Sequence, residues 1–290
     1  MNFARLLKLI PFYTSLCASL ASAQLAFCRP ATAVCKDDPI QVVSDTPADN
    51  YARLFLTSER VIEATVHFEC DGMDNAVPSE PLPRNFMITK AYENYEFLRI
   101  SQYDPAKPWH WGPYRYHVQI GLPSRSQTID YIYALPYAAE KHFTVSQSYR
   151  SKYTHLAGTP DEYAVDIMMP EGTPVLAARP GTVIACRADG DMGGAGQKYS
   201  ECANYVHVKH DDGTYGAYVH LKRNGVTVKP GQSVGVGTQL GLSGATGWVT
   251  CPHLHFMVYR LNSSLRAQSF PFKVRTASGI VQQLEEGETY

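Results

Sequence analysis

The sequence predicts a mainly β fold, with a β-sandwich-like domain followed by a second domain built on an antiparallel β-sheet. Residues 62–70 and 114–120 alternate between apolar and polar side chains, as strands with one buried face do. Proline and glycine break the stretches between such segments, and no long segment has the 3.6-residue period of an amphipathic helix. The length of 290 residues is sufficient for two domains.

The N-terminus has the pattern of a secretory signal. Arg5 and Lys8 precede an apolar run over residues 9–23, which is short for a membrane span and ends in Ala-Ser-Ala, a small-residue cleavage site. We therefore expect residues 1–23 to be removed, so that the mature chain starts at Gln24, is periplasmic or secreted, and does not stay inserted in a membrane. An uncleaved anchor is the alternative, and the proline, serine and threonine residues within the run argue against it.

Residues 24–135 form the first predicted domain. Short strands separated by turn residues, without a long helical period, are typical of a β-sandwich. Within residues 62–70 the apolar side chains, among them Val66 and Phe68, occupy every second position. We expect this set to face the core of the domain and the intervening polar set to face solvent.

Residues 136–290 form the second predicted domain. Residues 204–209 and 215–221 have the pattern of two strands joined by an Asp-Asp-Gly turn, which favours a β-hairpin. Strand alternation puts His220 on the same face as Gly216 and Tyr218, and we expect that face to be open. A further apolar strand at about residues 270–274 completes this domain.

The histidine pair His253-Leu254-His255 carries the most chemical information. Side chains two positions apart on a strand point to the same side, so both imidazoles face one way while Leu254 and Phe256 face a core. A rigid strand that presents two imidazoles suits metal binding or proton transfer. Since the chain has 10 histidines, such a pair taken alone also fits two solvated residues on an open sheet face.

This pair lies in the last of four motifs that follow one another along the chain. They are His155 followed by Tyr163-Ala-Val-Asp166, then Gly172-Thr-Pro-Val-Leu-Ala-Ala178, then Tyr218-Val-His-Leu221, and last the run from Gly244 to Pro252-His-Leu-His-Phe256. Together, over about residues 140–260, they resemble the lysostaphin-type (LytM-like) zinc metallopeptidases that cut peptidoglycan peptides. The resemblance implies a LytM-like zinc peptidase domain in residues 136–290.

The resemblance also implies a site. One zinc ion would be bound by His155, Asp166 and His255, and the family's two further active-site histidines fall on His220 and His253. Two imidazoles and one carboxylate leave a coordination position for water, and zinc lowers the pKa of that water toward about 7. The implied reaction is hydrolysis of peptide cross-links of bacterial peptidoglycan, whose peptides are the expected partner. The sequence leaves open which histidine is the general base.

Two other functions remain open at this stage. The first is a LytM-like regulator of a cell-wall amidase without catalysis of its own, although such members usually lack the zinc ligands that this chain keeps. The second is a different exported metallopeptidase role, such as cleavage of a glycine-rich protein. A net charge of −1 gives no field that would attract nucleic acid or an anionic membrane, and no motif indicates a protein partner.

Cysteine usage is consistent with export. Six cysteines would remain after signal removal, namely Cys28, Cys35, Cys70, Cys186, Cys202 and Cys251. An even number in an exported chain predicts disulfides. Cys186 and Cys202 flank a glycine-rich insertion at residues 189–197 and are the preferred pair, and two of the three N-terminal cysteines are expected to pair. We expect Cys251 to be buried or disulfide-bonded and not to be a fourth metal ligand.

Overall fold

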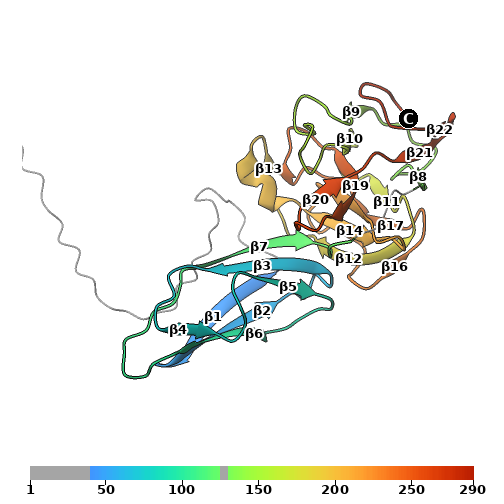
Figure 1. Ribbon diagram of the computed structural model, residues 1–290. Coiled ribbons are helices and arrows are strands. Elements are labelled where there is room, and N and C mark those ends of the chain that lie inside the picture. The colour runs from blue at the N-terminus through green and yellow to red at the C-terminus, as the bar shows by residue number, and fades with distance from the viewer. Residues whose placement is uncertain (1–39, 125–129) are drawn as a thin grey trace, which may run out of the picture.

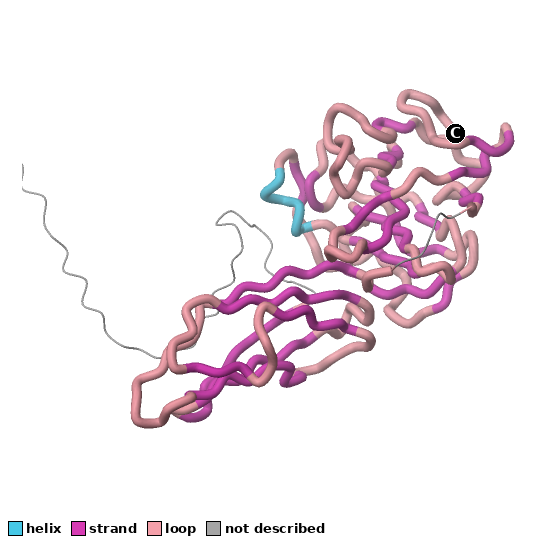
Figure 2. The backbone as a smooth tube through the Cα atoms, in the orientation of Figure 1, coloured by secondary structure: helices cyan, strands magenta, loops and turns pink. Residues whose placement is uncertain are grey.

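The computed structural model describes residues 40–124 and 130–290, and it confirms the mainly β fold. Two β-rich halves lie side by side, with a 3-10 helix, η1 (Gln197–Cys202), in the C-terminal half (Figures 1 and 2). The expected signal at residues 1–23, Cys28 and Cys35 lie outside the described residues. Within residues 40–124 and 130–290, no helix has the length and apolar character needed to cross a membrane.

The N-terminal half consists of two antiparallel sheets around one core. One sheet has the order β1 (Gln41–Ala48), β2 (Tyr51–Thr57), β6 (Tyr95–Gln102), β4 (Ala76–Pro78), and the other β5 (Arg84–Ile88), β3 (Ala64–Cys70), β7 (Tyr114–Ile120). Apolar side chains of both sheets form one buried cluster, including Leu54, Leu56, Val66, Phe68, Ile88 and Ile100. The alternation predicted for residues 62–70 is therefore what directs β3 into this core.

A long antiparallel sheet forms the centre of the C-terminal half. Its order is β16 (Ser233–Val234), β12 (Gly181–Arg187), β14 (Tyr205–Lys209), β15 (Tyr215–Val219), β19 (Leu254–Leu261), β10 (Val165–Ile167), β9 (Val145–Gln147), with β20 (Ala267–Ser269) on β19. The predicted hairpin is confirmed as β14 and β15, and Gly213 takes the positive φ of +78° that its turn requires. Leu254, Phe256 and Val258 are buried in the core, as predicted.

Three small sheets complete this half. They pair β11 (Pro174–Leu176) with β17 (Gln239–Leu242), β13 (Gly193–Gly194) with β18 (Gly247–Trp248), and β21 (Lys273–Thr276) with β22 (Gly279–Val281) and β8 (Ile132–Ala134). The strand expected at residues 270–274 begins instead at Lys273, because Pro271 has no N–H for a ladder. Since β8 pairs with β21, residues 132–134 pack with the C-terminal half, and the division at residue 135 stays a prediction.

The two halves share a contact on one face of the long sheet. The Ile62 amide donates to the Ile184 carbonyl at 2.8 Å, and Lys209 Nζ lies 2.7 Å from Glu63 Oε2. The Tyr259 hydroxyl donates to the Ile120 carbonyl at 3.0 Å. On β19, Tyr259 and His255 are four residues apart and so point to the same face. The N-terminal half thus packs on one end of the sheet face that carries His255 at the other end.

The cysteine pairing preferred from the sequence is wrong. Cys186 is a free thiol, because β12 turns it into the core, where its Sγ contacts the Val228 carbonyl oxygen at 3.8 Å. Cys70 is also free. Cys251 is a free, half-buried thiol and not the buried or bonded residue that was expected. Cys202 is disulfide-bonded, but not to Cys186.

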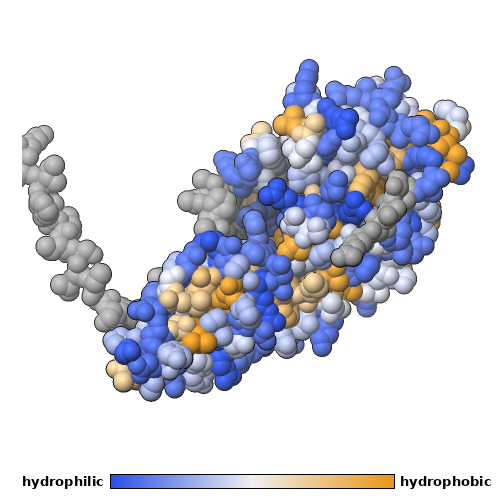
Figure 3. Space-filling model, viewed as in Figure 1, coloured by the Kyte–Doolittle hydropathy of each residue, from blue (hydrophilic) through white to orange (hydrophobic). Residues whose placement is uncertain are grey.

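The visible surface of the two halves is mostly hydrophilic, with apolar side chains in small groups (Figure 3). Apolar residues fill two main cores and a third, smaller cluster that includes Tyr215 and Tyr259, and the largest core lies between the long sheet and the small sheets. The strand side chains that are polar yet buried therefore need a specific explanation. Asp166, which is 3% exposed, is such a residue.

Candidate metal centre

Asp166 and His255 face each other across two neighbouring strands. Asp166 lies in the middle of β10, directly opposite His255 on β19, so both side chains project from the same face of the sheet. His255 Nδ1 is 2.9 Å from Asp166 Oδ1. The other imidazole nitrogen, Nε2, lies 3.6 Å from a carboxylate oxygen of Asp161. Local strand structure therefore places one imidazole and one carboxylate in contact.

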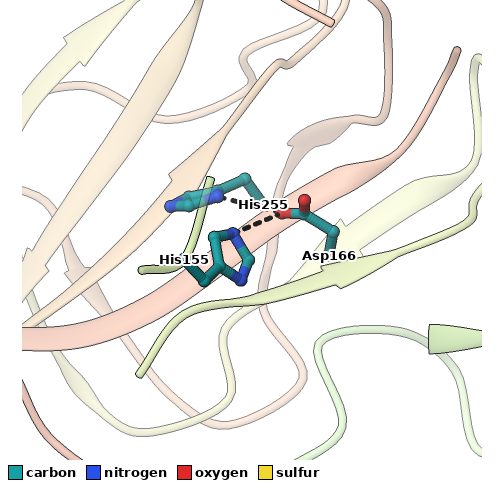
Figure 4. Close-up of side chains that lie close together, drawn as sticks. All are labelled: His155, Asp166 and His255. Carbon is teal, nitrogen blue, oxygen red and sulfur yellow. Dashed lines mark hydrogen bonds and ion pairs between the residues drawn. The ribbon is translucent and has the colours of Figure 1, made fainter. Parts of the chain in front are cut away.

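His155 reaches the same carboxylate from a loop. Its Nδ1 donates to the Ser148 carbonyl at 3.2 Å, which leaves an unprotonated Nε2 on the neutral ring. That Nε2 lies 3.3 Å from Asp166 Oδ1. In Figure 4 the three side chains of His155, Asp166 and His255 converge on one point. The Asp166 Oδ1 atom is therefore shared by two imidazoles.

The three residues fit a divalent metal ion. One ligand atom from each lies within 4.8 Å of those of the others, and no other such group occurs in residues 40–124 or 130–290. His155 is fully buried, and its Nε2 has no hydrogen-bond partner, which is costly for a polar atom unless something else binds it. Two imidazoles and one carboxylate are a ligand set that zinc accepts with a coordination position left free.

The electrostatics of the cluster favour a charged carboxylate. Burial by itself would raise the pKa of Asp166, but the contacts with His155 and His255 hold it well below its usual range. Burial would likewise lower the pKa of His255, yet the contacts with Asp161 and Asp166 raise it to about 10. The carboxylate therefore stays ionised near neutral pH, as a metal ligand must.

His220 reaches this centre by a route that strand alternation does not predict. The residue of β15 opposite His255 is Val219, so an extended chain would turn His220 to the other face, with Tyr218. That face is not open, because Tyr218 is fully buried and packs on Phe256. The expectation that alternation along β15 delivers His220 is therefore wrong. Instead β15 ends at Val219, and His220 takes a positive φ of 66°.

The positive φ places the His220 ring beside the histidine pair. Its ring centroid is 4.6 Å from that of His253 and 5.8 Å from that of His255. His220 Nδ1 donates to the Thr246 carbonyl at 2.7 Å. Burial first, and the neighbouring histidines second, lower the pKa of His220 to about 3. The ring is therefore neutral at physiological pH, with Nε2 able to accept a proton.

His253 has the same arrangement of its two nitrogens. Its Nδ1 donates to the Cys251 carbonyl at 2.9 Å, and its Nε2 lies 3.8 Å from Asp166 Oδ1. A carbonyl oxygen can only accept, so in both His220 and His253 the proton is on Nδ1. The Nε2 atom of His253 therefore lies beside the metal-binding cluster, and the ring of His220 packs against that of His253.

Two further residues of the site were not found from the sequence. Gln147, on β9, donates from Nε2 to Asp166 Oδ2 at 2.6 Å. Asp161 lies beside His255, and the contact with that imidazole lowers the pKa of Asp161 although its burial opposes this. Neither residue belongs to a motif. Gln147 could be found only from the pairing of β9 with β10, whereas Asp161, five residues before Asp166, has the proximity but no distinguishing pattern.

The centre lies in a groove of about 680 Å³. Exposed side chains of Tyr153, Leu156 and Trp248 form part of its walls. Trp248 is on β18, which pairs with β13, and a Cβ on Gly193 would lie only 1.8 Å from the Ala245 carbonyl oxygen, so this close approach requires glycine. All the described lining residues lie between positions 146 and 257, and none of them is Lys or Arg.

The fold and the site together have the features of a metallopeptidase: an antiparallel sheet, a His-Asp-His cluster and two basic imidazoles in an open groove. Residues 161–267 match the sequence model of Peptidase family M23, and this part of the chain is an M23 peptidase domain. The match begins six residues after His155. His155 lies outside the matched residues, and the structure places it in the site, where its Nε2 is 3.3 Å from Asp166 Oδ1.

The chain is similar to several known proteins over part of its length. Over 92 residues the chain is 44% identical to Cell division protein DipM of Caulobacter vibrioides, covering 32% of this chain and 13% of that protein. Over 91 residues it is 38% identical to Peptidoglycan DD-endopeptidase ShyA of Vibrio cholerae, covering 31% of this chain and 18% of that protein. The catalytic domain of the antimicrobial peptidase lysostaphin from Staphylococcus simulans is 29% identical, with a TM-score of 0.30, covering 46% of this chain and 94% of that domain. The chain thus spans less than a fifth of DipM or ShyA.

Proposed function

We propose that this protein is an exported, zinc-dependent endopeptidase that hydrolyses peptide cross-links of bacterial peptidoglycan. The observation that carries the proposal is the meeting of His155, Asp166 and His255 with His220 and His253 in one groove. The names of two relatives, a peptidoglycan DD-endopeptidase and lysostaphin, support the substrate class. The expected signal at residues 1–23 supports a periplasmic or secreted location.

In this proposal His155 Nε2, His255 Nδ1 and Asp166 Oδ1, which lie close together, would hold one zinc ion. When bound, zinc polarises a carbonyl group and makes a water molecule nucleophilic near neutral pH. The protein itself contributes the charge that keeps the ion in place, since the Asp166 carboxylate is buried and ionised. A protonated Asp166 would not serve as a ligand.

The two other histidines move the proton. Either His220 or His253 can accept a proton from the attacking water on Nε2, because the Nδ1 proton of each is given to a backbone carbonyl. The same Nε2 can then deliver that proton to the leaving amine nitrogen. The second imidazole, once protonated, stabilises the negative charge that develops on the scissile carbonyl oxygen. Both rings lie close enough to one another for these roles to be divided between them.

The groove supports a peptide substrate. Apolar side chains such as Leu156 and Trp248 can lie along an extended peptide, and none of the described lining residues is Lys or Arg. The other open function, a regulator without catalysis, has less support, because the five residues expected for a catalytic site come together.

Mass spectrometry of muropeptides tests the proposal. Purified protein starting at Gln24 is incubated with intact peptidoglycan, in parallel with the His253→Ala variant and with protein treated with a chelator. We expect cross-linked dimers to fall and monomers to rise with the untreated protein alone. Unchanged muropeptides, together with stimulation of a cell-wall amidase, would instead establish the regulator.

A further inference from the structure

A glutamine on the edge strand of the long sheet holds the carboxylate of the metal centre. Gln147 ends β9 and lies opposite Asp166 of β10, so the two side chains are on the same face. We propose that Gln147 is a positioning residue, which fixes Asp166 for metal binding and ties the loop of His155 to it. This inference rests on the proposed zinc site.

The two carboxylate oxygens of Asp166 have different partners. Gln147 Nε2 donates to Asp166 Oδ2 at 2.6 Å. The other oxygen, Oδ1, faces His255 Nδ1 at 2.9 Å and His155 Nε2 at 3.3 Å. With Oδ2 occupied by a donor, the carboxylate is oriented so that Oδ1 is the atom presented to a metal. Gln147 thereby selects the ligand atom without touching the metal.

The Gln147 amide has a fixed orientation. Its Oε1 accepts hydrogen bonds from Ser151 Oγ at 2.8 Å and from the backbone N–H of Thr154 at 3.2 Å. A backbone N–H can only donate, so it must meet the amide oxygen, and the amide nitrogen must then face Asp166. These hydrogen bonds therefore fix the orientation of the Gln147 amide.

Gln147 is also linked to the loop that carries His155. Thr154 immediately precedes His155, and both the amide and the hydroxyl of Thr154 contact Gln147. Through one side chain, β9 therefore restrains the ligand on β10 and the residue before the ligand on the loop. Such outer contacts commonly change metal affinity about 10–100-fold when they are removed.

The Gln147 side chain is neutral and leaves the charge of Asp166 unchanged. An amide donates a hydrogen bond without adding a positive charge, so the full negative charge of Asp166 remains available to a cation. Asp166 is 3% exposed, so without Gln147 its Oδ2 would lie buried with water largely excluded. An unpaired buried carboxylate oxygen is costly, and the side chain would rotate to relieve that cost.

The test compares Gln147→Met with Gln147→Ala. Methionine has a similar length but no amide, so it keeps the packing and removes the hydrogen bonds. We expect both variants to bind zinc about 10–100-fold more weakly than wild type in a competition with a chromophoric chelator. The visible absorption bands of the cobalt-substituted protein should also change, because the geometry at the metal changes. Gln239→Ala, on the exposed surface of β17, is the matched control and should alter neither readout.

The outcomes separate this inference from the proposed function. Wild-type affinity and an unchanged cobalt spectrum in Gln147→Met would overturn the role of Gln147. If the Gln147 variants do not fold, Ser151→Ala decides, since it removes a hydrogen bond that holds Oε1, and unchanged zinc affinity there would overturn the role. A wild-type protein that binds zinc but cuts no peptidoglycan refutes the proposed function only. A wild-type protein that binds neither zinc nor cobalt would refute both the proposed function and the role of Gln147.

Discussion

His220 lies beside His253, with ring centroids 4.6 Å apart, because the backbone of His220 leaves the strand conformation at the end of β15. Its φ of 66° falls in the left-handed region, which costs a residue with a Cβ about 1 kcal/mol relative to glycine. Without that turn the imidazole would follow Tyr218 into the core. A strained backbone therefore brings one of the two bases into the groove.

The strain at His220 predicts a difference in stability between two variants that are both inactive. His220→Gly should be more stable than His220→Ala by about 1 kcal/mol, because glycine adopts a positive φ without cost. Both variants should lose peptidoglycan cleavage and retain zinc, since neither removes one of the proposed ligands. Urea unfolding of the two purified variants measures the difference. Equal stabilities would show that the backbone at this position is not strained.

The proposed ligands and the proposed bases should separate in metal analysis. Asp166→Ala and His255→Ala should lose zinc, because each removes one of three ligand atoms that lie within 4.8 Å of one another. His253→Ala should keep about one zinc per chain and still be inactive. Elemental analysis after dialysis measures this. Full zinc occupancy in the Asp166→Ala variant would contradict the ligand assignment.

Buried His210 should make the fold sensitive to acid. Burial lowers the pKa of His210 to about 4, and its Nδ1 donates to the Pro180 carbonyl at 2.8 Å. The unfolded chain, with a histidine pKa of about 6.5, takes up this proton first. The stability contribution is therefore complete above about pH 6.5 and decreases as the pH falls toward 4, by about 2 kcal/mol between pH 7 and pH 5.

The variant His210→Asn isolates this effect. Asparagine does not titrate in this range, so its free energy of unfolding should change less between pH 7 and pH 5 than that of wild type. Urea unfolding with a chelator present, at both pH values, avoids a contribution from metal release. The same pH dependence in both proteins would assign the acid sensitivity to other groups.

Glu63 should stabilise the contact between the two halves without affecting the metal. Its carboxylate accepts a hydrogen bond from the Tyr215 hydroxyl and pairs with Lys209. Glu63→Ala removes the acceptor for both and should lower the unfolding free energy by about 1–3 kcal/mol. The exposed Glu59 provides the control variant Glu59→Ala. Zinc affinity should be unchanged in both, since none of these residues lines the groove.

The sequence by itself determined the features that depend on neighbours along the chain. The alternation in residues 62–70, the Asp-Asp-Gly turn and the His-Leu-His spacing are local patterns. In the structure these patterns form β3, the hairpin of β14 and β15, and two imidazoles that both approach Asp166. The motifs also named His155, Asp166, His220, His253 and His255, and all five line the groove.

The tertiary structure decided what depends on contacts between distant segments. Cys186 is free because β12 faces it into the core, His220 joins the site through a positive φ, and Gln147 meets Asp166 because β9 pairs with β10. None of these follows from spacing. Side-chain alternation is set by the local backbone, whereas strand order and register are set by which surfaces pack together, and a single residue that leaves the strand conformation reverses the direction of its side chain.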